Sequence, residues 1–152
     1  MSTASVAELA PNRPAVVMGR SGETVSFATF EERSNRMAHL FRARGLERGD
    51  TVALLLENHP RFLELAWAAH RAGLYYTAVN THLTAEEAAY IVRDSGARLL
   101  VSSRAMAPVA RVIDVEVEHR FMVDDVEEGW GDLDAALAAH LPTPIADEDR
   151  GT

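Results

Sequence analysis

Short apolar runs alternate with helix-like segments along most of this chain, and that alternation constrains the fold more than any other feature. The first run, residues 51–56, is apolar from Val52 onward and lies between Gly49-Asp50 and Asn58. A short run without polar interruptions predicts a strand buried on both faces, as in parallel sheets. Further strands are expected at residues 74–79, 98–102 and 119–123.

Helical segments separate these strands. Residues 60–72 begin with Pro60, which suits the first position of a helix, and Thr84 with Glu87 forms the Thr-x-x-Glu pattern of a capping box. A weaker helix, broken near Pro108, follows the third strand, and a short helix is expected over residues 132–141. Strands and helices at this spacing predict right-handed crossovers, so we expect an α/β fold: a parallel sheet with helices on both faces.

The N-terminal part has a different pattern. Two β-prone runs, residues 15–18 and 24–26, flank a turn that contains glycine and predict a β-hairpin. A helix over residues 28–44 follows, with Gly45 placed to end it. We therefore divide the chain into an N-terminal arm (residues 1–14), an α/β subdomain (15–141) and a linker (142–152). Trp67 is expected in the core, because it lies on the apolar side of its helix.

Composition excludes several kinds of function. The 152 residues fit one domain, and a net charge of −8 argues against nucleic acid as a partner, since binding it needs a basic stripe. The absence of cysteine excludes zinc thiolates and a thiol nucleophile, and is compatible with the cytoplasmic location that we expect. All 15 basic residues are arginine, so chemistry that requires a lysine cannot be completed within these residues. No apolar run approaches the roughly 18 residues of a membrane span.

No complete catalytic motif is found. The turn after the first parallel strand, residues 57–60, contains neither G-x-G-x-x-G nor a Walker sequence. No two histidines stand four residues apart, and G-x-S-x-G is absent. We therefore assign no catalytic residue and no metal ligand, and interpret Asp124-Asp125 as a solvated strand end. Open α/β sheets bind ligands at the carboxyl ends of their strands, so the remaining candidates are the polar residues there: 57–59, 80–82, 102–104 and 124–125.

A linked pattern runs through residues 25–103. Its elements are Gly49-Asp50 before a buried strand, Asn58-x-x-x-Phe62, Ala72-Gly73 before the next strand, and Leu83-Thr84-x-x-Glu87. This order resembles the N-terminal region of the adenylate-forming acyl-CoA synthetases, most closely their fatty-acid–CoA ligase branch. Two positions depart from the family pattern: residues 26–30 replace Thr-Tyr-x-Glu-Leu with Ser-Phe-Ala-Thr-Phe, and Ala78 replaces a proline.

The resemblance implies a two-step reaction in the full-length enzyme. A carboxylic acid, such as a fatty acid, is activated with ATP and Mg²⁺ to acyl-AMP, and the acyl group is then transferred to CoA. The resemblance also implies a loop on the CoA side at Asn80, Thr81, His82 and Leu83, and an arginine near the CoA phosphates at Arg104.

In the family, a phosphate loop that carries a lysine follows a segment like residues 147–152. We therefore expect an N-terminal fragment that holds no ATP, CoA or Mg²⁺ by itself and is inactive alone. Its partners would be the remainder of the same enzyme, the carboxylate substrate and, as a further option, a second copy in a homodimer.

A second hypothesis comes from a different class of protein. The chain is long enough to bury a core by itself, so a stand-alone, non-catalytic α/β module that binds a ligand or dimerises is also compatible with the sequence. An unpaired sheet edge would argue against this hypothesis, because exposed edges invite association.

Overall fold

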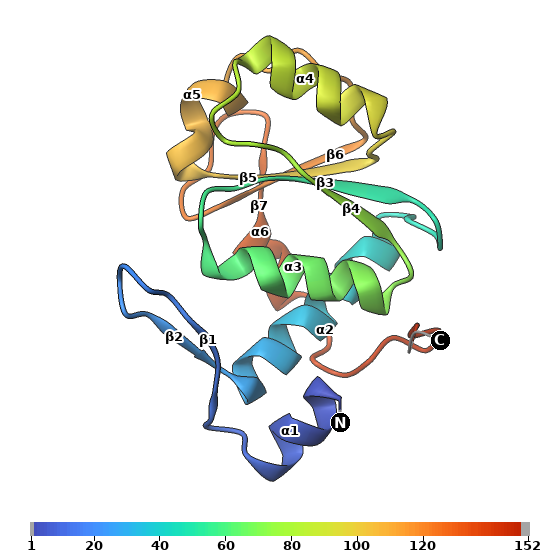
Figure 1. Ribbon diagram of the computed structural model, residues 1–152. Helices are drawn as coiled ribbons and strands as arrows, with labels where there is room; N and C mark the ends of the chain where they lie inside the picture. The colour runs from blue at the N-terminus through green and yellow to red at the C-terminus, as the bar shows by residue number, and fades with distance from the viewer. Residues whose placement is uncertain (1, 150–152) are drawn as a thin grey trace.

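A parallel sheet forms the centre of the molecule. The computed structural model describes residues 2–149, and its five-stranded sheet has the order β4-β3-β5-β6-β7, with every neighbouring pair parallel (Figure 1). The strands are β3 (Thr51–Leu55), β4 (Tyr75–Ala78), β5 (Leu99–Ser103), β6 (His119–Val123) and β7 (Gly131–Asp132). The α/β fold predicted from the alternating pattern is confirmed.

Helices cover both faces of the sheet (Figure 1). They are α2 (Phe27–Ala43), α3 (Pro60–Arg71) and α6 (Leu133–Ala138) on one face, and α4 (Ala85–Asp94), the 3-10 turn η1 (Arg104–Met106) and α5 (Ala107–Ala110) on the other. Leu54 belongs to the first core and Leu55 to the second, because successive side chains of a strand point to opposite faces. The two cores hold the strand ends in place.

The shortest strand, β7, gives no signal in the sequence. Gly131 and Asp132 pair with Phe121 and Met122 of β6. A Cβ atom at Gly131 would lie only 2.9 Å from the Phe121 ring, so glycine allows β7 to approach β6 closely. Two residues, one of them a glycine, form no apolar run, and only the pairing with β6 reveals the strand.

The N-terminal segment is not a free arm, which corrects that expectation. Residues Thr3–Leu9 form helix α1, and the Ser2 hydroxyl caps it by accepting a hydrogen bond from the Ser5 N–H at 3.2 Å. The predicted hairpin follows as β1 (Pro14–Val17) and β2 (Thr24–Ser26). The Trp67 indole N–H donates to the Thr3 hydroxyl (3.1 Å), so α1 is held by a contact with α3 that no local pattern encodes.

The surroundings of several aromatic side chains depend on the tertiary structure. Strand β4, predicted as one strand of the parallel sheet, lies at its edge: within residues 2–149 it pairs with β3 alone, and Tyr75 and Tyr76 are exposed. Trp67, expected in the core, lies on the outer side of α3, with its ring centroid 6.3 Å from that of Phe30 and 5.4 Å from that of His70. The order of strands decides which one is at the edge, and local apolar patterns do not contain that order.

Residues 142–149, expected to be a linker, pack against α2. The Asn35 side-chain amide donates to the Pro142 carbonyl (2.9 Å), and Ile145 is buried in the core that α2 shares. Arg42 pairs with Asp147 at 2.9 Å. This segment is therefore part of the folded unit, while residues 150–152 of the expected linker lie outside the described residues. No helix within residues 2–149 is both long and apolar enough to cross a membrane.

Candidate functional site

The carboxyl ends of β3, β5 and β6 meet at one edge of the sheet. Strand β3 continues into α3 on one face, whereas the neighbouring β5 continues into η1 and α5 on the other. Such a change of face between neighbouring strands is where open α/β sheets place their ligands. Here a hydrogen bond spans this point, because the hydroxyl of Ser103, the last residue of β5, donates to the carboxylate of Glu57 after β3.

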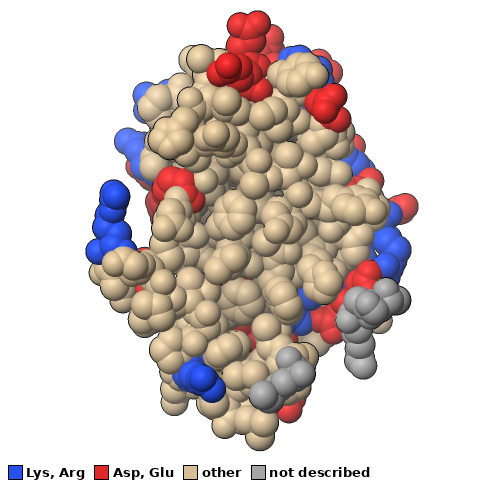
Figure 2. All heavy atoms as spheres, viewed as in Figure 1, with Lys and Arg blue, Asp and Glu red and all other residues tan. Residues whose placement is uncertain are grey.

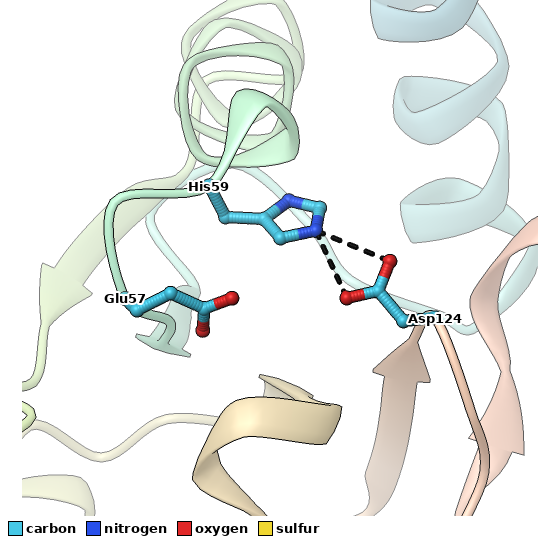
Figure 3. Close-up of side chains that lie close together, drawn as sticks. All are labelled: Glu57, His59 and Asp124. Atoms are coloured by element: carbon cyan, nitrogen blue, oxygen red, sulfur yellow. Dashed lines mark hydrogen bonds and ion pairs between the residues drawn. The ribbon is translucent and has the colours of Figure 1, made fainter. Parts of the chain in front are cut away.

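Three side chains converge next to this bond (Figure 3). Glu57 and His59 come from the loop between β3 and α3, and Asp124 follows β6; one potential ligand atom from each lies within 4.8 Å of the others. The Nε2 atom of His59 lies 3.3 and 3.2 Å from the two carboxylate oxygens of Asp124. Asp124 has a left-handed backbone (φ 74°), which aspartate tolerates better than most residues.

The hydrogen bonds of His59 argue against a metal ion in this cluster. Its Nδ1 atom accepts the backbone N–H of Arg61 at 3.0 Å and so caps the N-terminus of α3. A neutral imidazole whose Nδ1 is an acceptor carries its proton on Nε2, which then donates to Asp124. The Nε2 atom that faces both carboxylates therefore has no lone pair for a cation. Among the described residues this group does not fit Mg²⁺, and we interpret it as a hydrogen-bonded brace between two loops.

A hollow of about 620 Å³ lies beside the loops that follow β3 and β4, facing the hairpin. Asn80 and Thr81, both predicted as site residues, line it. The remaining lining residues are Val16, Val17, Met18, Gly19, Leu56, Glu57, Asn58, His59, Phe62, Leu63, Ala78 and Val79. Its walls combine apolar side chains with an almost equal share of polar surface, and the polar side chains come from the loops that follow the strands. A concave site with polar groups at the strand ends can hold a small molecule.

The other two predicted loop residues lie away from this hollow. His82 is exposed, and its backbone N–H donates to the Asn80 side-chain oxygen at 2.9 Å. Leu83 packs against the core under α4. The predicted capping box follows at once: the Thr84 hydroxyl accepts the Glu87 N–H (3.3 Å), and the Glu87 carboxylate accepts the Thr84 N–H (2.9 Å). Hydrogen bonds from Thr84 lower the pKa of Glu87, so the box keeps its carboxylate charged.

Arg104, the last predicted site residue, does not join the loop at Asn80. Its guanidinium lies 3.1 Å from the carboxylate of Asp125 and 3.4 Å from that of Glu127, and it is not among the residues that line the hollow. A hydrogen bond from Arg111 lowers the pKa of Glu127, with a smaller contribution from the charge of Arg104. The surroundings of Arg104 are therefore acidic, which does not favour a phosphate group.

The sequence did not predict that Glu57, His59 and Asp124 converge. Each residue follows a predicted strand, and the sequence does contain that signal. Because sequence order does not reveal which parallel strands are neighbours, the signal does not show that residues 57–59 and 124 meet.

Comparison with known proteins identifies the family of this chain. A family model described as "AMP-binding enzyme" matches residues 4–149. The long-chain-fatty-acid–CoA ligase FadD13 of Mycobacterium tuberculosis is 31% identical over 142 residues, which are 93% of this chain and 27% of that protein. The crotonobetaine/carnitine–CoA ligase of Citrobacter koseri is 36% identical over 114 residues, 73% of this chain and 22% of the ligase. The chain thus spans about a quarter of the length of these curated relatives.

Solved structures support the same family assignment. The N-terminal domain of FACL13 from M. tuberculosis superposes with a TM-score of 0.80 at 26% identity, covering 95% of this chain and 36% of that domain. An anthranilate CoA ligase, AuaEII, in complex with anthranoyl-AMP superposes with a TM-score of 0.82 and covers 97% of this chain and 28% of the ligase; at 18% identity it supports the fold alone. With the family model matched over almost every described residue and ligases similar over most of the chain, the protein belongs to the AMP-binding enzyme family and is homologous to the N-terminal part of acyl-CoA ligases.

Proposed function

We propose that this chain is the N-terminal part of an acyl-CoA synthetase that activates a carboxylic acid, such as a fatty acid, with ATP. The observation that supports this most is the continuous similarity to a fatty-acid–CoA ligase over 93% of the chain. In the first step a carboxylate oxygen attacks the α-phosphate of ATP, forming acyl-AMP and releasing pyrophosphate. In the second step the CoA thiol attacks the acyl carbonyl, forming the thioester and releasing AMP.

The described residues would contribute binding surface to this reaction, not reacting groups. Asn80 and Thr81 are proposed to face CoA, since they line the hollow at the carboxyl ends of the strands. His82 and Leu83 would shape that loop from outside. A role for Arg104 at the CoA phosphates would require it to leave Asp125 and Glu127. Mg²⁺ would be held elsewhere in the parent enzyme, because the His59 cluster does not fit it.

Pyrophosphate exchange tests the proposal. The full gene product that contains this segment should exchange pyrophosphate into ATP only when a carboxylic acid is present, and the 152-residue chain alone should show no exchange. An inactive full product, tried with acids of several chain lengths, would refute the synthetase. Robust exchange by the short chain would refute its inactivity.

The role of the loop has its own test. Asn80→Ala should raise KM for CoA while leaving the first half-reaction unchanged, since CoA enters only in the second step. Asn80→Asp, which keeps the oxygen that accepts the His82 N–H, separates loss of the turn from loss of a CoA contact. An unchanged KM for both variants would remove Asn80 from the CoA site.

The alternative, a stand-alone binding or dimerisation module, is supported by two features. Both sheet faces are covered by helices within residues 2–149, and residues 142–149 pack back onto α2. A natural stop codon after Thr152, together with a stable monomer or homodimer in solution, would favour this second candidate.

A further inference from the structure

The outer side of helix α4 carries three exposed side chains in one row. Glu86, Tyr90 and Arg93 stand four and three positions apart, so they lie on the same face of the helix. Tyr90 is 63% exposed and supplies the large apolar group of this row. Figure 2 shows acidic and basic side chains close together at the end of the molecule where Figure 1 places α4. The row thus combines both charges with an aromatic ring.

The two charged members of the row have no ion-pair partner within residues 2–149. Seven positions separate them, which is roughly 10 Å along the helix axis, so neither side chain can pair with the other. The Arg93 guanidinium donates one hydrogen bond, from Nη2 to the Asp114 carbonyl at 3.1 Å, and most of its five donors remain available. One end of the row therefore offers a negative charge to a partner, and the other end offers a positive charge.

A hollow of about 560 Å³ lies beside Tyr90, between α4 and the segment that follows α5. Ala85 and Ala89 line it from α4, and Val112, which is 66% exposed, lines it from the other side. The remaining lining residues are Glu86, Tyr90, Arg93 and Asp114. Because alanine side chains are small, a second helix can approach α4 closely here and insert a bulky side chain. An exposed aromatic ring and a hollow that can receive such a ring are therefore neighbours on one surface.

This surface is complementary to itself. A two-fold axis brings the same patch of both subunits together, so every contact between two different residues occurs twice. If two copies of α4 pack antiparallel with the axis beside residues 89 and 90, Glu86 of each copy faces Arg93 of the other, because the two positions are almost equally far from the axis. Each Tyr90 ring then lies beside the hollow of the other copy. A second copy of this chain thus satisfies the charges and the hollow at the same time.

We propose that the α4 surface, formed by Glu86, Ala89, Tyr90, Arg93 and Val112, joins two copies of this protein in a symmetric homodimer. Two ion pairs between Glu86 and Arg93 would flank the two Tyr90 rings at its centre. A contact made by one ten-residue helix and the segment beside it is near the lower limit of specific interfaces, roughly 1,000 Å² in total, so we expect a dimer in equilibrium with the monomer. The inference goes beyond the proposed function and does not depend on it, because none of these residues is assigned to the reaction.

Sedimentation equilibrium of the full gene product over a range of concentrations tests the dimer. Glu86→Arg and Arg93→Glu each place like charges opposite one another at two points of the interface, so each should raise the Kd of the dimer at least about tenfold. The double variant re-forms both ion pairs with their signs exchanged. Its Kd should return to within about threefold of the value for the unsubstituted protein.

The double variant also separates this inference from a purely local role. Glu86 lies in the first turn of α4 and Arg93 in the last, so both charges favour the helix dipole. If they acted only in that way, the double variant would be the least stable of the three, and it would not recover the dimer. Circular dichroism melts of each variant measure that local contribution.

Two further variants test the centre of the interface and the specificity of the charge effect. Tyr90→Glu should abolish the dimer, because it places two like charges at the axis. Glu8→Arg is the matched control: Glu8 is exposed on α1, at the opposite end of the molecule, and reversing its charge should leave the Kd unchanged (Figure 1).

The outcomes are separable from those of the pyrophosphate exchange assay. A full product that is monomeric at every concentration would overturn the α4 dimer even if it is an active synthetase. A dimer whose Kd none of the α4 variants changes, or that the double variant does not restore, would also overturn the inference. A dimer that the double variant restores, in a product without synthetase activity, would support the α4 surface and refute the proposed reaction.

Discussion

Glu64 provides the sharpest test of how this fold is held together. Its side chain on α3 is fully buried, and its carboxylate accepts hydrogen bonds from Arg33 (3.3 Å) and Arg61 (3.0 Å). Arg61 also pairs with Asp134 of α6. The cluster therefore links α2, α3 and α6 on one face of the sheet, and replacing Glu64 by alanine removes its centre.

The expected loss follows from the partners that remain. Removing one partner of a buried ion pair costs about 3–5 kcal/mol, because the other charge is left in a low-dielectric site. Arg61 keeps Asp134, and the Arg33 side chain is 37% exposed and can turn to water. We therefore expect Glu64→Ala to cost about 3 kcal/mol, the lower end of that range. With an m value of about 2 kcal/mol/M, the urea midpoint falls by about 1.5 M.

Equilibrium urea unfolding followed by tryptophan fluorescence measures this change. Glu32→Ala is the matched control, because Glu32 forms an exposed i,i+4 pair with Arg36 at 3.0 Å and should lose no more than about 0.5 kcal/mol. Glu64→Gln keeps one acceptor oxygen and should fall between the two. Equal losses of unfolding free energy for Glu64→Ala and Glu32→Ala would refute the argument that burial makes the ion pairs of Glu64 important for stability.

Three further predictions concern other parts of the fold. His59→Ala should lower the free energy of unfolding by about 1 kcal/mol, because the cap on the Arg61 N–H is lost, whereas His59→Asn should retain most of that stabilisation. Added Mg²⁺ should leave the Tm of the unsubstituted chain unchanged, and a large rise in Tm would contradict the interpretation of the His59 cluster as a hydrogen-bonded brace. Gly131→Ala should lower the Tm measured by circular dichroism, because the Cβ of the alanine would lie 2.9 Å from the Phe121 ring. An unchanged Tm would show that β7 is not held against Phe121. Burial lowers the pKa of His140, so the unfolded chain binds more protons than the folded one, and stability should decline as the pH falls below about 6.5. His140→Asn should remove that part of the pH dependence of urea unfolding. Identical pH profiles for the unsubstituted chain and the variant would contradict this prediction.

Several elements follow from sequence because their causes are local. The capping box at Thr84 and Glu87, Pro60 at the start of α3 and the apolar run that becomes β3 each act through residues within a few positions of one another. The alternation of these elements was sufficient to predict a parallel sheet with helices on both faces, since crossover connections have one favoured hand. The linked motifs in residues 25–103 pointed to the family for the same reason, because their order is a property of the chain.

Tertiary structure alone decided which elements meet. Strand order made β4 an edge strand and exposed Tyr76, and it brought His59 to Asp124 across 65 positions of sequence. Packing against α2 and α3 turned the expected arm and linker into ordered parts of the fold, through contacts such as Trp67 with Thr3. These outcomes depend on long-range contacts whose free energy is gained only when distant segments are assembled, so no local pattern of residues contains them.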